Sequence, residues 1–198
     1  MMTNKNNALL ASQIIHYAMA DCFLGKLLVA KSAVGVCAIC LADHNEELPQ
    51  ALIELVPKTT LILDQQSCQQ ELDQLLNYIS TPSIGLNLTL DMQGTLFQEQ
   101  VWQVLLKIPL GEYLSYTEVA NRVGKPKAVR AVANACANNR LAIAIPCHRV
   151  VRANGNLAGY RWGLKRKQEL LRRESEAVGV NSMTSNLINA HAPCSAIV

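Results

Sequence analysis

Residues 141–151 read LAIAIPCHRVV, an apolar stretch interrupted only by Cys147, His148 and Arg149. The aliphatic residues carry the chain into a hydrophobic interior, so the fold has to accommodate these three polar side chains there. A thiol beside an imidazole in apolar surroundings is typical of a base-activated cysteine nucleophile. The two residues alone also fit a core cysteine next to a hydrogen-bonded histidine, so the rest of the sequence has to decide.

The length and composition predict a globular protein. With 198 residues, 50% of them hydrophobic and 17% charged, the chain can form one sizeable core or two small packed domains. No apolar run is long enough to span a membrane and no secretory signal is present, so we expect a cytoplasmic location. The seven cysteines have irregular spacings, which favours reduced thiols over a disulfide framework.

The charge differs between the two halves of the chain. Residues 1–90 hold four Lys and Arg residues against eight acidic residues, a net charge of −4. Residues 91–198 hold fourteen against seven, a net charge of +7. The half that contains Cys147 therefore attracts polyanions. A DNA-binding surface and an ordinary solvated basic surface both fit this imbalance.

The first half of the sequence alternates strand and helix patterns. Three short strands are predicted within residues 13–42, and a further strand lies at 59–63 between amphipathic helices at 45–56 and 67–79. These patterns predict an N-terminal α/β scaffold domain at residues 1–91, without evident chemistry of its own.

Cys37 and Cys40 form a Cys-x-x-Cys pair inside the third predicted strand. Residues three apart on a strand point to opposite faces, so a zinc or redox role would need a distorted backbone. The spacing favours a core role for both cysteines, and no metal site is predicted.

A second, mostly helical domain is predicted at residues 92–175. Residues 96–108 are amphipathic, and residues 115–118 have the spacing of a capping box that opens a short helix ending at Gly124. Another helix follows at 127–138. Two short helices joined by a tight glycine-containing turn are typical of a helix-turn-helix motif, although ordinary helix pairs share the pattern.

The helix at 127–138 carries little bulk and one long cation, Arg130. Small side chains let a helix approach the narrow minor groove closely, whereas a major-groove reader needs repeated Asn, Gln or Arg. The alanines of this helix are Ala128, Ala131, Ala133, Ala135 and Ala137.

A last helix is predicted at residues 163–174. Glu174 stands at its C-terminal end, where the helix dipole disfavours a negative charge, so the residue either has a partner or lies on the surface. Residues 176–198, with Cys194, are predicted to be a disordered tail. The helix is expected to bury Leu164, Leu170 and Leu171 and to expose a basic side made of Lys165, Arg166, Lys167, Arg172 and Arg173.

The second half resembles the O6-alkylguanine-DNA alkyltransferases, also called methylated-DNA–protein-cysteine methyltransferases. The match extends over residues 95–174, with a looser one back to residue 16. Residues 141–143 and 159–163 are most similar to the C-terminal half of the bacterial adaptive-response (Ada) proteins, and we expect this protein to lack the zinc-bearing domain of those proteins. The shared residues are Phe97, Gln98, Val101, Trp102, Ile108, Pro109, Gly111, Ser115, Tyr116, Val119, Ala120, Pro126, Ala131, Val132, Asn139, Ile145 to Val151, Gly159, Tyr160, Gly163, Lys165, Leu170, Leu171 and Glu174.

The resemblance implies a fold and an activity. The first domain would be ribonuclease-H-like and the second a helical domain with the helix-turn-helix. The activity would be DNA repair by transfer of the alkyl group, mainly methyl, from O6-alkylguanine, and also from O4-alkylthymine, to Cys147. The resulting thioether is irreversible, so each molecule would act once. The family needs no cofactor; a monomer would bind duplex DNA through the minor groove and flip out the damaged base.

The resemblance also implies roles for individual residues. His148 would take the Cys147 proton through a water, Glu174 would orient the imidazole, Tyr116 would act on N3 of the base, and Asn139 would be a hinge for the active-site loop. The ordinary alternatives are a packing tyrosine and a helix-terminating asparagine.

The same resemblance implies contacts to DNA and a substrate pocket. Arg130 would fill the space of the extruded base; its simpler alternative is a phosphate contact. Because Trp162 would crowd the pocket, methyl adducts should react quickly and O6-benzylguanine poorly. The implied DNA-contacting residues are Arg130, Tyr116, Ala128, Ala131, Ala135 and Lys127, and the implied pocket residues are Ala142, Val150, Tyr160, Arg161 and Trp162.

Three other classes of protein fit parts of the pattern. A cysteine hydrolase or acyltransferase would explain the thiol and imidazole but not the alanine-rich helix with one arginine. A DNA-binding regulator would explain the helix-turn-helix. A damage-binding relative without transfer activity often has tryptophan in place of the cysteine, and Cys147 argues against it.

Overall fold

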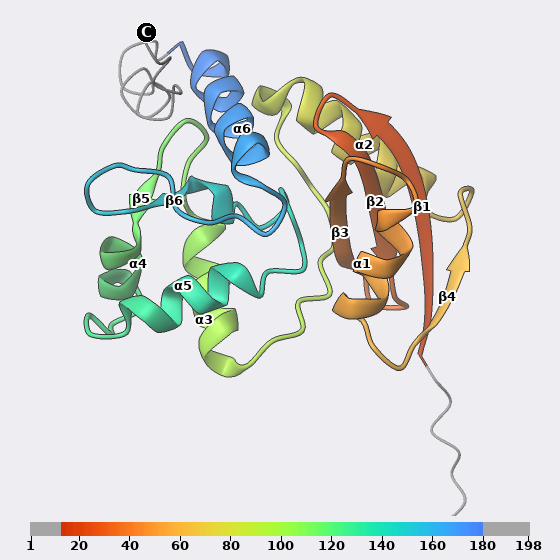
Figure 1. Cartoon of the computed structure of the whole chain (residues 1–198), viewed down its shortest axis with the longest axis horizontal. Coiled ribbons are helices and arrows are strands. Elements are labelled where there is room, and N and C mark those ends of the chain that lie inside the picture. Colours follow the sequence, from red (N-terminus) through yellow and green to blue (C-terminus); the bar gives the residue numbers. More distant parts are fainter. Residues whose placement is uncertain (1–12, 180–198) are drawn as a thin grey trace, which may run out of the picture.

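Three hydrophobic segments near the start of the chain supply three of the strands of a four-stranded sheet (Figure 1). The computed structural model describes residues 13–179. Strands β1 (Ile14–Cys22), β2 (Gly25–Lys31) and β3 (Val36–Ala42) are consecutive and antiparallel, and β4 (Thr60–Leu63) joins β1 in parallel, which gives the order β3-β2-β1-β4. The sequence predicted these four strands correctly.

Two helices cover this sheet. Helix α1 (Glu47–Leu55) packs on β2 and β3, and α2 (Gln69–Ser80) packs on β1 and β2. Every residue of β3 is buried, as in a strand covered on both faces. Cys37 and Cys40 therefore have the predicted core positions.

The outer edge of β3 is paired with segments that are distant in sequence. Val36 exchanges main-chain hydrogen bonds of 2.8 Å with Thr89 and Asp91 after the short helix η1 (Pro82–Ile84), and the Ile39 amide donates to the Arg140 carbonyl at 2.8 Å. The chain just before the 141–151 stretch is thus attached to the N-terminal sheet.

The second half of the chain is mostly helical, and its predicted elements are present (Figure 1). The helix predicted from residue 127 begins two residues later, because the amide of Ala128 bonds back to Lys125 in a turn at 2.9 Å. The elements are α3 (Leu96–Leu105), β5 (Leu114–Ser115), α4 (Tyr116–Arg122), α5 (Val129–Ala137), η2 (Cys147–Arg149), β6 (Val150–Val151) and α6 (Leu164–Ala177).

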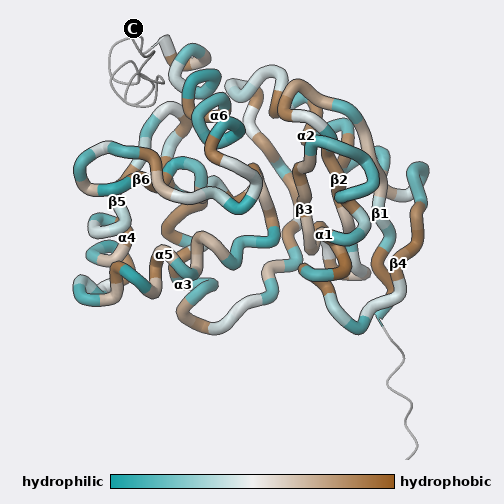
Figure 2. The backbone as a smooth tube through the Cα atoms, viewed as in Figure 1, coloured by the Kyte–Doolittle hydropathy of each residue, from teal (hydrophilic) through white to brown (hydrophobic). Residues whose placement is uncertain are grey.

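The buried face of helix α6 differs from the predicted one. Lys167 is fully buried and Leu164 is 39% exposed, so both were assigned to the wrong side. The buried stripe contains Lys167, Leu170, Leu171 and Glu174, which have the i, i+3, i+4, i+7 spacing of one helix face. Figure 2 shows α6 as a largely hydrophilic helix. Because it has few apolar residues, polar residues occupy part of its buried face.

The basic side of α6 is largely neutralised. Arg172 pairs with Glu169 and Glu176, Arg173 pairs with Glu169 at 2.6 Å, and Arg166 pairs with Asp43 at 2.5 Å. These arginines carry much less free positive charge than the sequence indicates.

Helix α6 continues to Ala177, two residues into the predicted tail; residues 180–198, with Cys194, lie outside the described part of the chain. The six cysteines among residues 13–179 are free thiols. In the same range no group of three or more His, Cys, Asp or Glu side chains is arranged to hold a metal ion. None of the helices at residues 13–179 is long and apolar enough to cross a membrane.

Candidate active site

Asn139 braces the loop that leads to Cys147. Its Nδ2 donates hydrogen bonds to the Ile145 carbonyl at 2.9 Å and to the Cys147 Sγ at 3.2 Å. Its Oδ1 accepts from the Leu141 amide at 2.9 Å. The side chain is buried at the end of α5, so one amide group joins the helix, the loop and the thiol.

The loop itself contains two tight turns. Ile143 has a φ of 70°, and the Ala144 amide bonds to the Ala142 carbonyl at 2.7 Å. The Cys147 amide bonds to the Ile145 carbonyl at 2.8 Å around Pro146. Both are three-residue γ-turns, and a left-handed conformation is strained for a β-branched residue. The surrounding core therefore imposes the backbone path that presents the thiol.

A short pair of parallel strands brings Tyr116 to the same site. Strand β6 follows η2 directly, and its Val150 and Val151 pair with Leu114 and Ser115 of β5. The capping box between Ser115 and Glu118 then starts α4 at Tyr116. Tyr116 therefore lies beside η2, although it is 31 positions away in the sequence.

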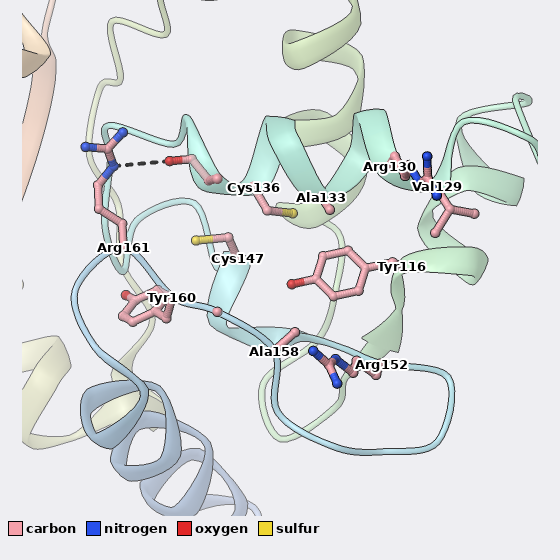
Figure 3. A pocket seen from close by; sticks show the side chains of 12 residues that line it. Tyr116, Val129, Arg130, Ala133, Cys136, Cys147, Arg152, Ala158, Tyr160 and Arg161 are labelled. Carbon is pink, nitrogen blue, oxygen red and sulfur yellow. Dashed lines mark hydrogen bonds between the residues drawn. The ribbon is translucent and has the colours of Figure 1, made fainter.

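These elements enclose a pocket of about 570 Å³, which Figure 3 shows from close by. Cys147 lies in its wall, and Tyr116 and Tyr160 project from the neighbouring segments. Arg161 lies on one side of the pocket and Arg130 and Arg152 on the other. The lining residues are Tyr116, Val129, Arg130, Ala133, Cys136, Ala137, Cys147, Arg152, Ala158, Gly159, Tyr160 and Arg161.

The Cys147 thiol is almost completely buried. Burial raises its pKa, while the hydrogen bond from Asn139 and the positive charge of Lys167 act in the opposite direction. The thiol is therefore protonated at rest and needs a nearby base to become a nucleophile.

His148 and Glu174 form a buried pair behind the thiol. Their Nε2 and Oε1 atoms are 2.8 Å apart, and both side chains are at most 1% exposed. Among the described residues the Nδ1 atom of His148 has no hydrogen-bond partner, so it is available to accept a proton. Burial raises the pKa of Glu174, but the charges and hydrogen bonds of His148 and Arg149 outweigh it and lower the pKa to about 2.

Arg149 and Tyr78 extend this pair, and the sequence analysis assigned neither a role. Arg149 donates to both oxygens of Glu174, at 2.8 Å from Nε and 2.9 Å from Nη2. Its Nη2 also donates to the Tyr78 hydroxyl at 2.9 Å. A charged residue inside an apolar run signals a buried partner, which made Arg149 detectable from the sequence. Tyr78 gives no comparable signal.

Lys167 is a further buried cation that the sequence analysis missed. Its ammonium donates to the main-chain carbonyls of Val150 at 2.6 Å and Ala158 at 3.2 Å. Burial lowers its pKa to about 8, and the neighbouring thiols partly oppose that shift. Its charge acts on Cys147 across the wall of the pocket.

The residues expected to touch DNA divide into two groups. Lys127, Arg130 and Ala131 are exposed on or just before α5, and Ala128 is half-buried. Ala135 is 1% exposed and packs into the core, so the expectation that it contacts DNA was wrong. It belongs to the inner face of α5, against which α3 packs through the hydrogen bond from the Trp102 indole to the Ala135 carbonyl at 3.0 Å.

Of the residues expected to form the substrate pocket, some line it and others do not. Tyr160 and Arg161 line the pocket, but Ala142, Val150 and Trp162 do not. Ala142 and Val150 are fully buried in the core. Trp162 is buried and lines a separate groove with Phe23 and Gly25, so its narrowing of the substrate pocket stays a prediction.

The chain is similar to known proteins in both sequence and structure. The family model described as 6-O-methylguanine DNA methyltransferase, DNA binding domain, matches residues 96–176. The chain is 51% identical over 162 residues to the bifunctional transcriptional activator/DNA repair enzyme Ada of Escherichia coli, covering 82% of this chain and 46% of that protein. It therefore spans about half the length of that relative.

Two further relatives match over nearly their whole length. The methylated-DNA–protein-cysteine methyltransferase of Mycobacterium bovis is 36% identical over 161 residues, which cover 81% of this chain and 93% of that protein. The crystal structure of Mycobacterium tuberculosis OGT in complex with DNA has 34% sequence identity and a TM-score of 0.69, over 82% of this chain and 94% of that one. The chain thus belongs to the methylated-DNA–protein-cysteine methyltransferase family.

Proposed function

We propose that the protein repairs DNA by moving the alkyl group of O6-alkylguanine, mainly methyl, onto its own Cys147. The observation that carries the proposal is the position of the thiol. It lines a pocket of about 570 Å³, it accepts a hydrogen bond from Asn139, and the adjacent residue belongs to the buried His148–Glu174 pair. Family membership supports the same reaction.

In the proposed mechanism His148 removes the Cys147 proton through a water. The Glu174 carboxylate then stabilises the imidazolium without accepting its proton, because the low pKa of Glu174 makes it a weak base. Asn139 donates to the sulfur and Lys167 lies nearby as a cation, and both favour the thiolate.

The thiolate attacks the alkyl carbon as the bond from that carbon to guanine O6 breaks. The electron pair of the broken bond goes to the base, which leaves as a guanine anion stabilised by a hydrogen bond from the Tyr116 hydroxyl to N3 and then takes up a proton from water. Burial and the neighbouring thiols raise the pKa of Tyr116 to about 12, so it is a neutral phenol able to donate a hydrogen bond. The product is a thioether, which water does not cleave, so each molecule reacts once.

We further propose that α5 enters the minor groove. Arg130 and Ala131 are exposed on α5, with Lys127 just before it, and Arg130 also lines the pocket mouth. The target atom is inaccessible within a duplex, so the nucleotide has to be flipped into the pocket, at a cost of roughly a few kcal/mol. Arg130 would occupy the space that the base leaves.

The proposal includes three finer points from the sequence. O4-alkylthymine is a second substrate, the protein acts as a monomer, and it is cytoplasmic. Competition between the two lesions in one duplex, sedimentation at micromolar concentration and cell fractionation test these points separately.

The mass of the intact protein after incubation with O6-methylguanine DNA tests the reaction. The expected result is one added methyl group, about 14 Da, on the peptide with Cys147, and no second turnover. Cys147→Ser should bind the same DNA and remain unmodified, since an unactivated hydroxyl is a poor nucleophile. Repeated turnover, or methylation of the pocket residue Cys136 instead, would contradict the proposed reaction.

A further inference from the structure

We propose that Tyr78 of α2 is a positioning residue for alkyl transfer, so that the N-terminal domain completes the catalytic group. The inference rests on the proposed function. Tyr78 lies outside the segment 96–176 that the family model matches, and it is separated from Glu174 by 96 positions. Helix α6 runs between the helical half and the sheet half (Figure 1), and its Glu174 reaches Tyr78 of α2 through a hydrogen bond.

The contacts of the Tyr78 hydroxyl reach the catalytic pair directly. The oxygen accepts a hydrogen bond from Arg149 Nη2 at 2.9 Å, and the hydroxyl donates to Glu174 Oε1 at 3.4 Å. The same Oε1 atom is 2.8 Å from His148 Nε2. Tyr78 is 6% exposed, so water replaces these bonds poorly.

Tyr78 fixes the direction of the carboxylate in two ways. It holds one end of the Arg149 guanidinium, whose other end is held by the Ile108 carbonyl at 2.6 Å. The guanidinium in turn contacts both oxygens of Glu174. A carboxylate held at this angle keeps Oε1 against Nε2 of His148 and so fixes the orientation of the imidazole ring.

The Tyr78 hydroxyl also partly neutralises the negative charge on Glu174 Oε1 by donating a hydrogen bond to it. Three donors converge on that atom, from His148, Arg149 and Tyr78. Removing the hydroxyl leaves more negative charge for the imidazole, which then holds a proton more tightly. The reaction's dependence on pH therefore records the loss of the Tyr78 hydroxyl. A tyrosine that merely filled core space would not have this effect.

The experiment is the pH dependence of methyl transfer in Tyr78→Phe, with Tyr17→Phe as the matched control. Tyr17 is a half-buried tyrosine of β1 that takes no part in the described hydrogen bonds of Glu174. For Tyr78→Phe we expect a maximal rate roughly 3- to 10-fold lower on both duplex DNA and the free O6-methylguanine base. The acid limb of the profile should move to higher pH, with DNA affinity unchanged. Tyr17→Phe should follow the wild type.

The same substitution in a Glu174→Gln protein keeps the test decisive if Tyr78→Phe is less stable than the wild type. Tyr78→Phe should cause no further loss of rate in a Glu174→Gln protein, because its effect is exerted through that carboxylate. An additive loss, or a pH profile that superimposes on the wild type after scaling, would overturn the proposal and leave Tyr78 a packing residue. Absence of Cys147 methylation in the wild type would instead overturn the proposed function.

Discussion

The ammonium of Lys167 donates a 2.6 Å hydrogen bond to the main-chain carbonyl of Val150, three residues after Cys147. A second bond, of 3.2 Å, reaches the Ala158 carbonyl on the return segment, residues 152–163, which connects β6 to α6. A fully buried cation thus joins α6 to both sides of the turn that frames the pocket. Both acceptors are neutral, so its charge is only partly compensated and remains available to the thiol.

This buried charge predicts how stability depends on pH. The pKa of Lys167 is about 8 in the folded protein, against an ordinary value of 10.5. Between these values the unfolded chain binds more protons than the folded one, so this group makes stability rise with pH. Relative to Lys167→Met, the wild type should gain at most about 1.4 kcal/mol per pH unit in that window. Urea unfolding of both proteins from pH 7 to 10.5 measures the difference, and a constant difference would contradict it.

Lys167 should also affect the reaction. Lys167→Met removes a cation that stabilises the Cys147 thiolate, so methyl transfer should slow at neutral pH on duplex DNA and free base alike. Lys165→Met, a change at an exposed position of the same helix, is the control. Equal rates for Lys167→Met and wild type would show that the charge does not reach the thiol.

Arg130→Ala should slow repair of duplex DNA far more than reaction with the free O6-methylguanine base. Its proposed role is to hold the flipped state open, and a free base needs no flipping. Single-turnover rates on the two substrates give the comparison. Equal losses would make Arg130 a general structural residue of α5.

Arg152 should contact a phosphate. Its side chain lines the pocket beside Tyr116, and an alkylated guanine carries no charge for it to pair with. In Arg152→Gln the slope of log affinity for duplex DNA against log salt should fall by about 1. Arg172→Gln is the control, since Glu169 and Glu176 already pair with that arginine. An unchanged slope for Arg152→Gln would exclude the phosphate contact.

Arg161, rather than Trp162, should limit the size of the adduct. Arg161 lines the pocket and donates to the Ala137 carbonyl at 3.1 Å, which closes the wall between α5 and the return segment. Arg161→Ala should raise the sensitivity to O6-benzylguanine roughly tenfold or more, because removing an overpacked side chain typically changes affinity by that much. Trp162→Phe should leave it unchanged. The same sensitivity in Arg161→Ala and wild type would place the size limit elsewhere.

The features of the fold and the site that the sequence predicted are those encoded by neighbouring residues in the chain. The capping box at Ser115, the thiol and imidazole at Cys147 and His148, and the four strands all follow from short-range patterns. The structure also brings Glu174 to His148, 26 positions away, as the family resemblance implied.

The parts that could not be predicted depend on tertiary packing. A basic residue on a charged helix was assigned to solvent, yet the spacing to Leu170, Leu171 and Glu174 places Lys167 on the buried face. Ala135 has the same composition signal as Ala131 but the opposite orientation. Tyr78 acquires its partners only when α2 and α6 meet, and no local pattern encodes that meeting.

The pairing along the outer edge of β3 has a consequence for solubility. By strand order β3 is terminal in its sheet, and its free main-chain groups are occupied by Thr89, Asp91 and Arg140. An unprotected, hydrophobic terminal strand is a template for pairing with another molecule. Substitutions that release the loop around Asn139 would therefore expose the unpaired edge of β3. Such variants should aggregate as well as lose alkyl-transfer activity.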